Sequence, residues 1–129
     1  MREEPRHKPT NSELRILRVL WDRGPSTVRE VHEELAKDRD TGYTTVLKLM
    51  QIMVEKGVLE RVESGRAHVY RPIGAEAEAK RDLVTDFMSR AFGGSAAELV
   101  LHALASKPAT PDELSKIREM LDKLEGRHE

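Results

Sequence analysis

The chain has 129 residues and a formal net charge of −1, with 35% charged and only 4% aromatic residues. This length allows one domain, or one domain with an appendage, and the composition favours a mainly α protein over a β-sandwich. The absence of cysteine excludes a disulfide framework, a thiolate metal site and a cysteine nucleophile, and it favours an intracellular, cytoplasmic setting.

Neither a membrane span nor an export signal is evident. No apolar run approaches the ~18 residues of a transmembrane helix, so we expect no membrane insertion. The first residues, MREEPRHKPT, lack the apolar segment of a secretory signal, and residues 1–9 are predicted to form a flexible arm. Residues 1–72 carry 14 Lys and Arg against 12 Asp and Glu, and residues 73–129 carry 8 against 11. Because this asymmetry is mild, nucleic-acid binding can be predicted only from where the charges lie.

Two capping boxes mark the first two helices. Thr10 and Glu13 form the first box, and Asp22-Arg23-Gly24-Pro25 ends the helix that follows. Thr27 and Glu30 form the second, and the charged run at residues 37–40 ends that helix. Apolar residues recur at helical spacing in both segments: Leu14, Leu17, Leu20 and Trp21, then Val28, Val31 and Leu35.

A third helix and a hairpin follow. The segment TGYTTVLKLMQIMVEKG, residues 41–57, predicts a helix that Thr41 can cap and Gly57 ends. Its inward stripe consists of Val46, Leu49, Met50 and Met53. Residues 58–63 and 67–71 flank Ser64-Gly65-Arg66 and indicate a hairpin that Pro72 closes. Since a lone hairpin is marginally stable, it must pack on the helices. Residues 10–72 are therefore predicted to form a winged helix-turn-helix DNA-binding domain.

Residues 73–129 predict three more helices, which are too short to build an independent core. The first covers 73–91, the second carries Leu99 and Leu104, and Thr110 and Pro111 begin the third. Their apolar stripes need a partner, either the first domain or the same region of a second chain. We favour a symmetric homodimer, which makes 73–129 a helical dimerisation domain. The residues predicted at its interface are Leu83, Phe87, Leu99, Leu101, Leu104, Leu114, Ile117, Leu121 and Leu124.

The third helix and the hairpin supply a candidate DNA-binding face. In a helix-turn-helix protein, the recognition helix places its N-terminal residues against base edges in the major groove. Thr can bond phosphate or base edges, Gln can pair with adenine, and Lys can meet phosphate or guanine. Only Glu60 and Glu63 oppose the basic residues of the hairpin, which we expect to lie on phosphates. The predicted DNA-binding residues are Tyr43, Thr44, Thr45, Lys48, Gln51, Arg61, Arg66, His68 and Arg71.

No catalytic, metal or cofactor site is predicted. His32-Glu33 begins a zinc-protease pattern, but residue 36 is Ala, so His32 is interpreted as a surface histidine. His102 is interpreted as a partly buried interface residue, and Phe87, Met88 and Phe92 as core rather than a ligand pocket. Two other functions stay open: a regulator that senses a small ligand directly, and a winged-helix module for protein contacts only. The basic hairpin argues against the second.

Long stretches of the chain resemble the BlaI/MecI penicillinase-repressor family, from about residue 9 to 125. They are ELRILRVLWDRGPSTVREVHEEL, GYTTVLKLMQIMVEKGVLER, SGRAHVYRP, FGGSAAELVLHAL and PDELSKIREMLDKL. The resemblance implies a homodimeric transcriptional repressor that binds a palindromic double-stranded operator with TACA-like and TGTA-like halves. It implies base reading by Tyr43, Thr44, Thr45 and Lys48, and a wing at Arg66 and His68. It also implies relief of repression by an inducing signal, often through a membrane-embedded sensor protease.

One departure from the family concerns that relief. Antibiotic-responsive members are cut at an Asn-Phe bond in the dimerisation region, and the matching pair in LVLHALA is His102-Ala103. We therefore expect release by another route or a cut elsewhere. The copper-responsive branch uses a cysteine metal motif, which a chain without cysteine does not have.

Overall fold

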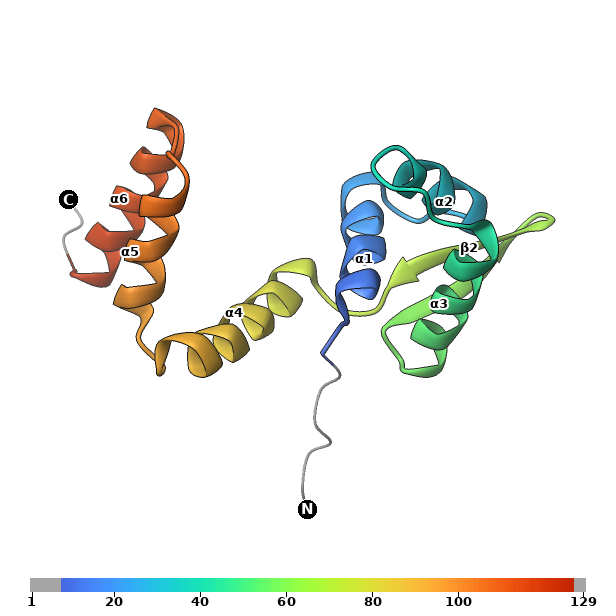
Figure 1. Ribbon diagram of the computed structural model, residues 1–129, viewed down its shortest axis with the longest axis horizontal. Coiled ribbons are helices and arrows are strands. Elements are labelled where there is room, and N and C mark those ends of the chain that lie inside the picture. The colour runs from blue at the N-terminus through green and yellow to red at the C-terminus, as the bar shows by residue number, and fades with distance from the viewer. Residues whose placement is uncertain (1–7, 127–129) are drawn as a thin grey trace, which may run out of the picture. The chain divides into compact units, whose positions relative to one another are not determined.

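The computed structural model describes residues 8–126 and contains six helices and one hairpin over that range (Figure 1). Residues 1–7 of the predicted arm lie outside the described residues. Two compact units can be distinguished: the first ends at Leu83 and the second begins at Val84. The division falls within α4 (Glu76–Phe92), later than the predicted domain boundary at residue 72. The boundary at residue 72, between the DNA-binding and dimerisation domains, stays a prediction.

The first two helices, α1 (Asn11–Arg23) and α2 (Val28–Ala36), begin where the sequence predicts. The Thr10 hydroxyl accepts from the Glu13 amide at 3.1 Å, and the Glu13 carboxylate accepts from the Thr10 amide at 3.1 Å. Thr27 and Glu30 make the same reciprocal pair. Gly24, at φ 93°, ends α1 in a conformation that a side chain would strain. Both capping boxes are confirmed.

Helix α3 (Tyr43–Glu55) begins differently from the prediction. Its N-cap is Gly42, which has no side chain that could accept a capping hydrogen bond. The predicted cap, Thr41, is wrong because it lies one residue too early, and its hydroxyl instead points to the Arg39 carbonyl at 3.5 Å. The start of α3 therefore lacks the side-chain acceptor that α1 and α2 have.

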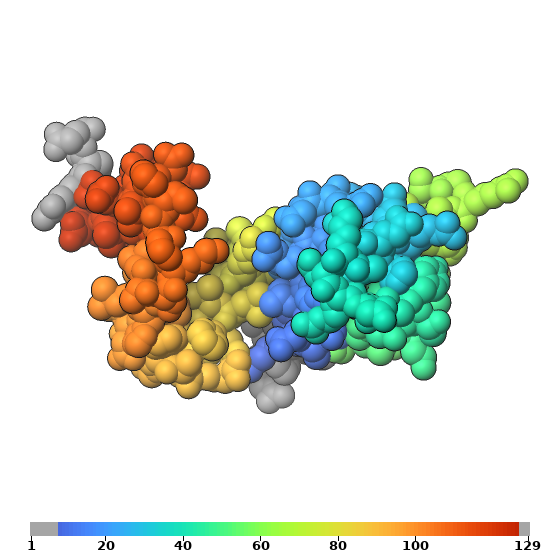
Figure 2. Space-filling model, turned by 45° about the horizontal axis from the view of Figure 1, so that its top comes forward, coloured from blue at the N-terminus to red at the C-terminus, as the bar shows by residue number. Residues whose placement is uncertain are grey.

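The hairpin pairs β1 (Leu59–Ser64) with β2 (Ala67–Pro72) in an antiparallel register that runs from Leu59 opposite Pro72 to Ser64 opposite Ala67. The turn has two residues, with Gly65 at φ 66° in the first central position, as a type II′ turn requires. Residues 61–68 are exposed, and the hairpin tip projects beyond the rest of its unit (Figure 2). At the other end, Ser26 exchanges two backbone hydrogen bonds with Tyr70, which ties β2 to the loop before α2.

The buried core of the first unit joins α1, α2, α3 and the base of the hairpin. Its members are Ile16, Leu17, Leu20, Val28, Val31, Leu35, Val46, Met50, Met53, Leu59 and Tyr70. One charged residue is buried among them: Glu13 is 3% exposed, and its carboxylate lies 2.8 Å from the Lys56 ammonium just after α3. The base of the hairpin is thus fixed to the helices, whereas its tip is not.

The second unit contains the end of α4 together with α5 (Ala96–Ser106) and α6 (Pro111–Leu124). Thr110 caps α6 and Pro111 is its first residue, as predicted, and Glu113 completes a capping box with Thr110. None of the described side chains of these helices is buried within the chain. Phe92 packs against the rings of Phe87 and His102, at 5.7 and 5.5 Å between centroids.

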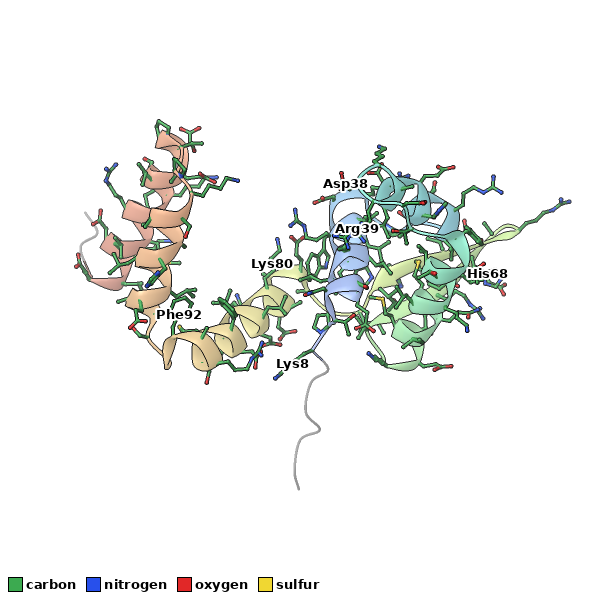
Figure 3. All side chains as sticks on the ribbon, in the orientation of Figure 1. Lys8, Asp38, Arg39, His68, Lys80 and Phe92 are labelled. Carbon is green, nitrogen blue, oxygen red and sulfur yellow. The ribbon has the colours of Figure 1, made fainter. Side chains whose placement is uncertain are left out.

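The first turns of α4 belong to the first unit. The ammonium of Lys80 lies 5.4 Å from the ring centroid of Trp21 on α1, and it also lies 2.6 Å from the carboxylate of Glu76 (Figure 3). A cation over an indole face is attracted by the ring quadrupole. This contact connects the first turns of α4 with α1.

Candidate nucleic-acid interface

One side of α3 is buried and the other is exposed, because its apolar residues recur at helical spacing. Val46, Met50 and Met53 have no exposed surface. The side chains that were predicted to face DNA are all exposed: Tyr43, Thr44, Thr45, Lys48 and Gln51. The helix therefore presents hydroxyl, amide and ammonium groups to a partner while its other side fills the core.

The register of the hairpin separates its basic residues onto two faces. Successive strand residues point to opposite sides, so directly opposed partners share a face. Arg61 is opposite Tyr70, and Glu63 is opposite His68. Arg71 is opposite Glu60 on the other face, where its Nε lies 2.6 Å from the Glu60 carboxylate. Arg61 and His68 thus share the face of the buried Tyr70, and Arg71 does not.

A hollow of about 480 Å³ lies between α2, α3 and the hairpin. It brings together four of the predicted residues from segments far apart in the sequence: Tyr43, Gln51, Arg61 and His68. Figure 3 shows His68 on the hairpin beside α3. The remaining lining residues are Thr27, Val28, Arg29, Leu47, Ala67 and Tyr70. The hollow is cationic through its arginines and carries two tyrosine rings in its wall.

The other predicted residues lie outside this hollow. Thr44, Thr45 and Lys48 are exposed elsewhere on α3, and Arg66 is exposed in the hairpin turn. Arg71 is exposed but engaged with Glu60. Some of the predicted DNA-binding residues therefore line the hollow, and the others lie outside it.

Arg29 lines the hollow but is not among the residues predicted to bind DNA. It lies in the first turn of α2, outside the buried stripe, and lines the hollow together with Arg61. A basic residue in the first turn of a helix is unfavourable for the helix dipole. That mismatch is a sequence signal that Arg29 serves something other than helix stability.

His32 is not the plain surface histidine that the sequence suggested. It is half-buried, and its Nε2 lies 2.7 Å from the carbonyl oxygen of Thr41. Its ring also meets the ring of Tyr43 edge-on, at 5.8 Å between centroids. Both contacts join α2 to the start of α3.

The hydrogen bond from Lys37, aided by its charge, lowers the pKa of Glu34 at the end of α2. Residues 8–126 contain no cluster of His, Asp and Glu that could hold a metal ion. Within the same range, no helix has the length and apolarity to cross a membrane.

Residues 9–123 match the family model described as penicillinase repressor. The transcriptional regulator BlaI of Mycobacterium tuberculosis is 34% identical over 118 residues, which is 90% of this chain and 84% of that protein. The penicillinase repressor of Bacillus licheniformis is 24% identical and covers 92% of each chain.

Two solved structures are similar. One is the Bacillus licheniformis BlaI monomeric form in complex with the blaP half-operator, with a TM-score of 0.52, 25% identity and coverage of 59% of this chain and 93% of that chain. The other is a mutant of ZitR from Lactococcus lactis, with a TM-score of 0.52, 18% identity and coverage of 98% of this chain and 80% of that chain. The second likeness concerns the fold alone.

Proposed function

Because this chain belongs to the penicillinase repressor family, we propose that it is a transcriptional repressor that binds a palindromic DNA operator as a homodimer. One observation carries the proposal. Side chains of α3 and of the hairpin, far apart in sequence, line one cationic hollow beside the exposed face of the recognition helix. The protein acts by occupying DNA and has no catalytic role.

Base reading is assigned to the exposed side of α3. Tyr43, Thr44, Thr45, Lys48 and Gln51 are exposed, and groups of these kinds distinguish base edges in the major groove. Phosphate binding belongs to Arg61, Arg66 and His68 of the hairpin, with Arg29 of α2 added to the predicted set. Support comes from the BlaI relative, whose solution structure contains a half-operator.

The dimer interface is assigned to the apolar side chains of α4, α5 and α6. Leu101, Leu121 and Leu124 are 67%, 52% and 76% exposed, and Leu83, Leu99, Leu104, Leu114 and Ile117 are only half-buried in one chain. A second copy would remove these surfaces from water, which stabilises by about 25 cal/mol for each Å². Two recognition helices held about 34–36 Å apart then meet successive major grooves.

Release of the operator follows an inducing signal. A membrane-bound sensor protease is one route, but the Asn-Phe pair at which the resemblance implies cleavage is replaced here by His102-Ala103, within α5. The Ser106 hydroxyl also donates to the His102 carbonyl at 2.7 Å. Incubation with the activated sensor should therefore leave this bond intact, and mass spectrometry that finds a clean cut there would overturn this view.

A gel shift over a salt series tests the function. Purified full-length protein is titrated onto its own upstream DNA and onto scrambled DNA of equal length. We expect selective binding that weakens as salt rises, since phosphate contacts release counterions. Equal, weak binding to both DNAs would refute the repressor function and favour a module for protein contacts.

Substitutions on α3 test which residues read bases. Thr45→Ala and Lys48→Ala should reduce affinity for the upstream DNA more than for scrambled DNA, by about 1–3 kcal/mol for a base contact. Glu55→Ala, at the exposed end of α3, is the matched control for a helix-surface change. An equal loss on both DNAs would assign Thr45 and Lys48 to phosphate contacts instead.

A further inference from the structure

We propose that His32 is a positioning residue, which fixes where the first turn of α3 lies on DNA and thereby sets the protein's selectivity. The inference rests on the proposed function, because it concerns how the same face reads bases. It assigns a role to a side chain of α2 that does not itself belong to the recognition helix.

The first turn of α3 needs such a support. Helices α1 and α2 start at threonine N-caps whose hydroxyls accept from the backbone, but α3 starts at Gly42 and has no side-chain cap. The residues that follow, Tyr43 to Thr45, are exposed and carry the base-reading groups. Because no side chain caps this helix, the orientation of these residues depends on other contacts.

His32 supplies two contacts, on either side of Gly42. Its Nε2 lies 2.7 Å from the Thr41 carbonyl oxygen, and since a carbonyl only accepts, Nε2 carries the proton and donates. Its ring packs edge-on against Tyr43, with an interplanar angle of 83°. The imidazole therefore fixes the residue before the N-cap and the residue after it.

These contacts connect two rigid parts of the motif. α2 packs into the core through Val28, Val31 and Leu35, so His32 extends from a fixed helix. Thr41 and Tyr43 lie beyond the exposed loop of residues 37–40, which includes the labelled Asp38 and Arg39 (Figure 3). A hydrogen bond and a ring contact across this loop hold the recognition helix to α2 at the end that meets DNA.

The experiment compares full-length variants at His32. His32→Ala removes both contacts, His32→Phe keeps a ring without the donor, and His32→Gln keeps an N–H donor at similar reach. Glu33→Ala, the exposed neighbour on α2, is the matched control. Each protein is titrated onto its own upstream DNA and scrambled DNA over a salt series, with urea unfolding measured in parallel.

We expect His32→Ala to lower the ratio of specific to non-specific affinity by about threefold to tenfold, the usual worth of one hydrogen bond. The salt slope should stay that of the wild type, since no phosphate contact is lost. The Gln variant should recover more selectivity than the Phe variant, and Glu33→Ala should behave as wild type.

Three outcomes overturn the inference while the proposed function stands. One is that the wild type selects its upstream DNA and the Ala variant has the same ratio of specific to non-specific affinity, while urea unfolding shows that the variant is folded. Another is a salt slope that falls by about 1.8, which is about 0.9 for each protomer of the proposed homodimer and would make His32 a phosphate contact. If His32→Ala does not fold, equal selectivity of the Gln and Phe variants overturns the hydrogen-bond role. A wild type without selectivity overturns both proposals together.

Discussion

Arg61 and Arg71 allow a test in which two changes of equal charge differ only in position. Both are exposed arginines of the hairpin, and replacing either with Ala removes one positive charge. Arg61 lies on the face of Tyr70 and lines the hollow beside α3, whereas Arg71 lies on the opposite face, 2.6 Å from Glu60. Arg61→Ala should therefore weaken DNA binding, and Arg71→Ala should change it little.

The expected size follows from counterion release. Each phosphate contact contributes about 0.9 to the slope of log K against log salt. When the salt concentration falls from 1 M to 0.1 M, the affinity of a variant that lacks one contact therefore rises about eightfold less than that of the wild type. A homodimer loses the contact twice. The Arg71–Glu60 pair is half exposed on both sides, and such a pair contributes about 0–1 kcal/mol to stability. The Arg71 variant should keep nearly the full slope.

Fluorescence anisotropy of labelled upstream DNA, over a range of salt concentrations, measures these slopes. Urea unfolding checks the fold of each variant, and surface changes of this kind usually shift stability by less than about 0.5 kcal/mol. An Arg71→Ala slope that falls as much as that of Arg61→Ala would refute the assignment of faces. An unchanged Arg61→Ala slope would refute phosphate binding by this face of the hairpin.

Further predictions concern stability and assembly. Met50→Ala should lower the free energy of unfolding by about 2–5 kcal/mol, because Met50 is fully buried, and urea titration measures the loss. Lys56→Met should cost about 1–3 kcal/mol by the same measurement, since it removes the ammonium beside the buried Glu13 carboxylate; an unchanged midpoint would show that this ion pair contributes nothing. Leu114→Asp with Leu121→Asp should yield monomers in analytical ultracentrifugation, keep the circular dichroism of the first unit and weaken operator binding; a variant that stays dimeric and binds tightly would show that the interface lies elsewhere.

Features that depend on neighbours in sequence were predictable. Thr10 with Glu13, and Thr27 with Glu30, form capping boxes because the bonding groups lie three residues apart on one helical turn. The hairpin followed from β-branched and aromatic residues around Gly65. The family resemblance is likewise confirmed over residues 9–123.

Features that depend on distant contacts were not predictable. The bond between His32 and Thr41 spans the loop between two helices, and no periodic pattern marks it. Thr41 was expected to cap α3, since threonine is a good cap, but the chain turns one residue later, at Gly42. The separation of Arg61 from Arg71 requires the strand register, which sets the face of each side chain.

The contact between Lys80 and Trp21 gives the protein an intrinsic optical reporter. Trp21 is the only tryptophan of the chain, and its half-buried indole lies under an ammonium that α4 supplies. Indole emission responds to nearby charge and to water, so detachment of the first turns of α4 from α1 changes the emission spectrum. A titration with unlabelled DNA can thus show whether binding changes the contact of α4 with α1, and Lys80→Met gives the emission expected when the ammonium is absent.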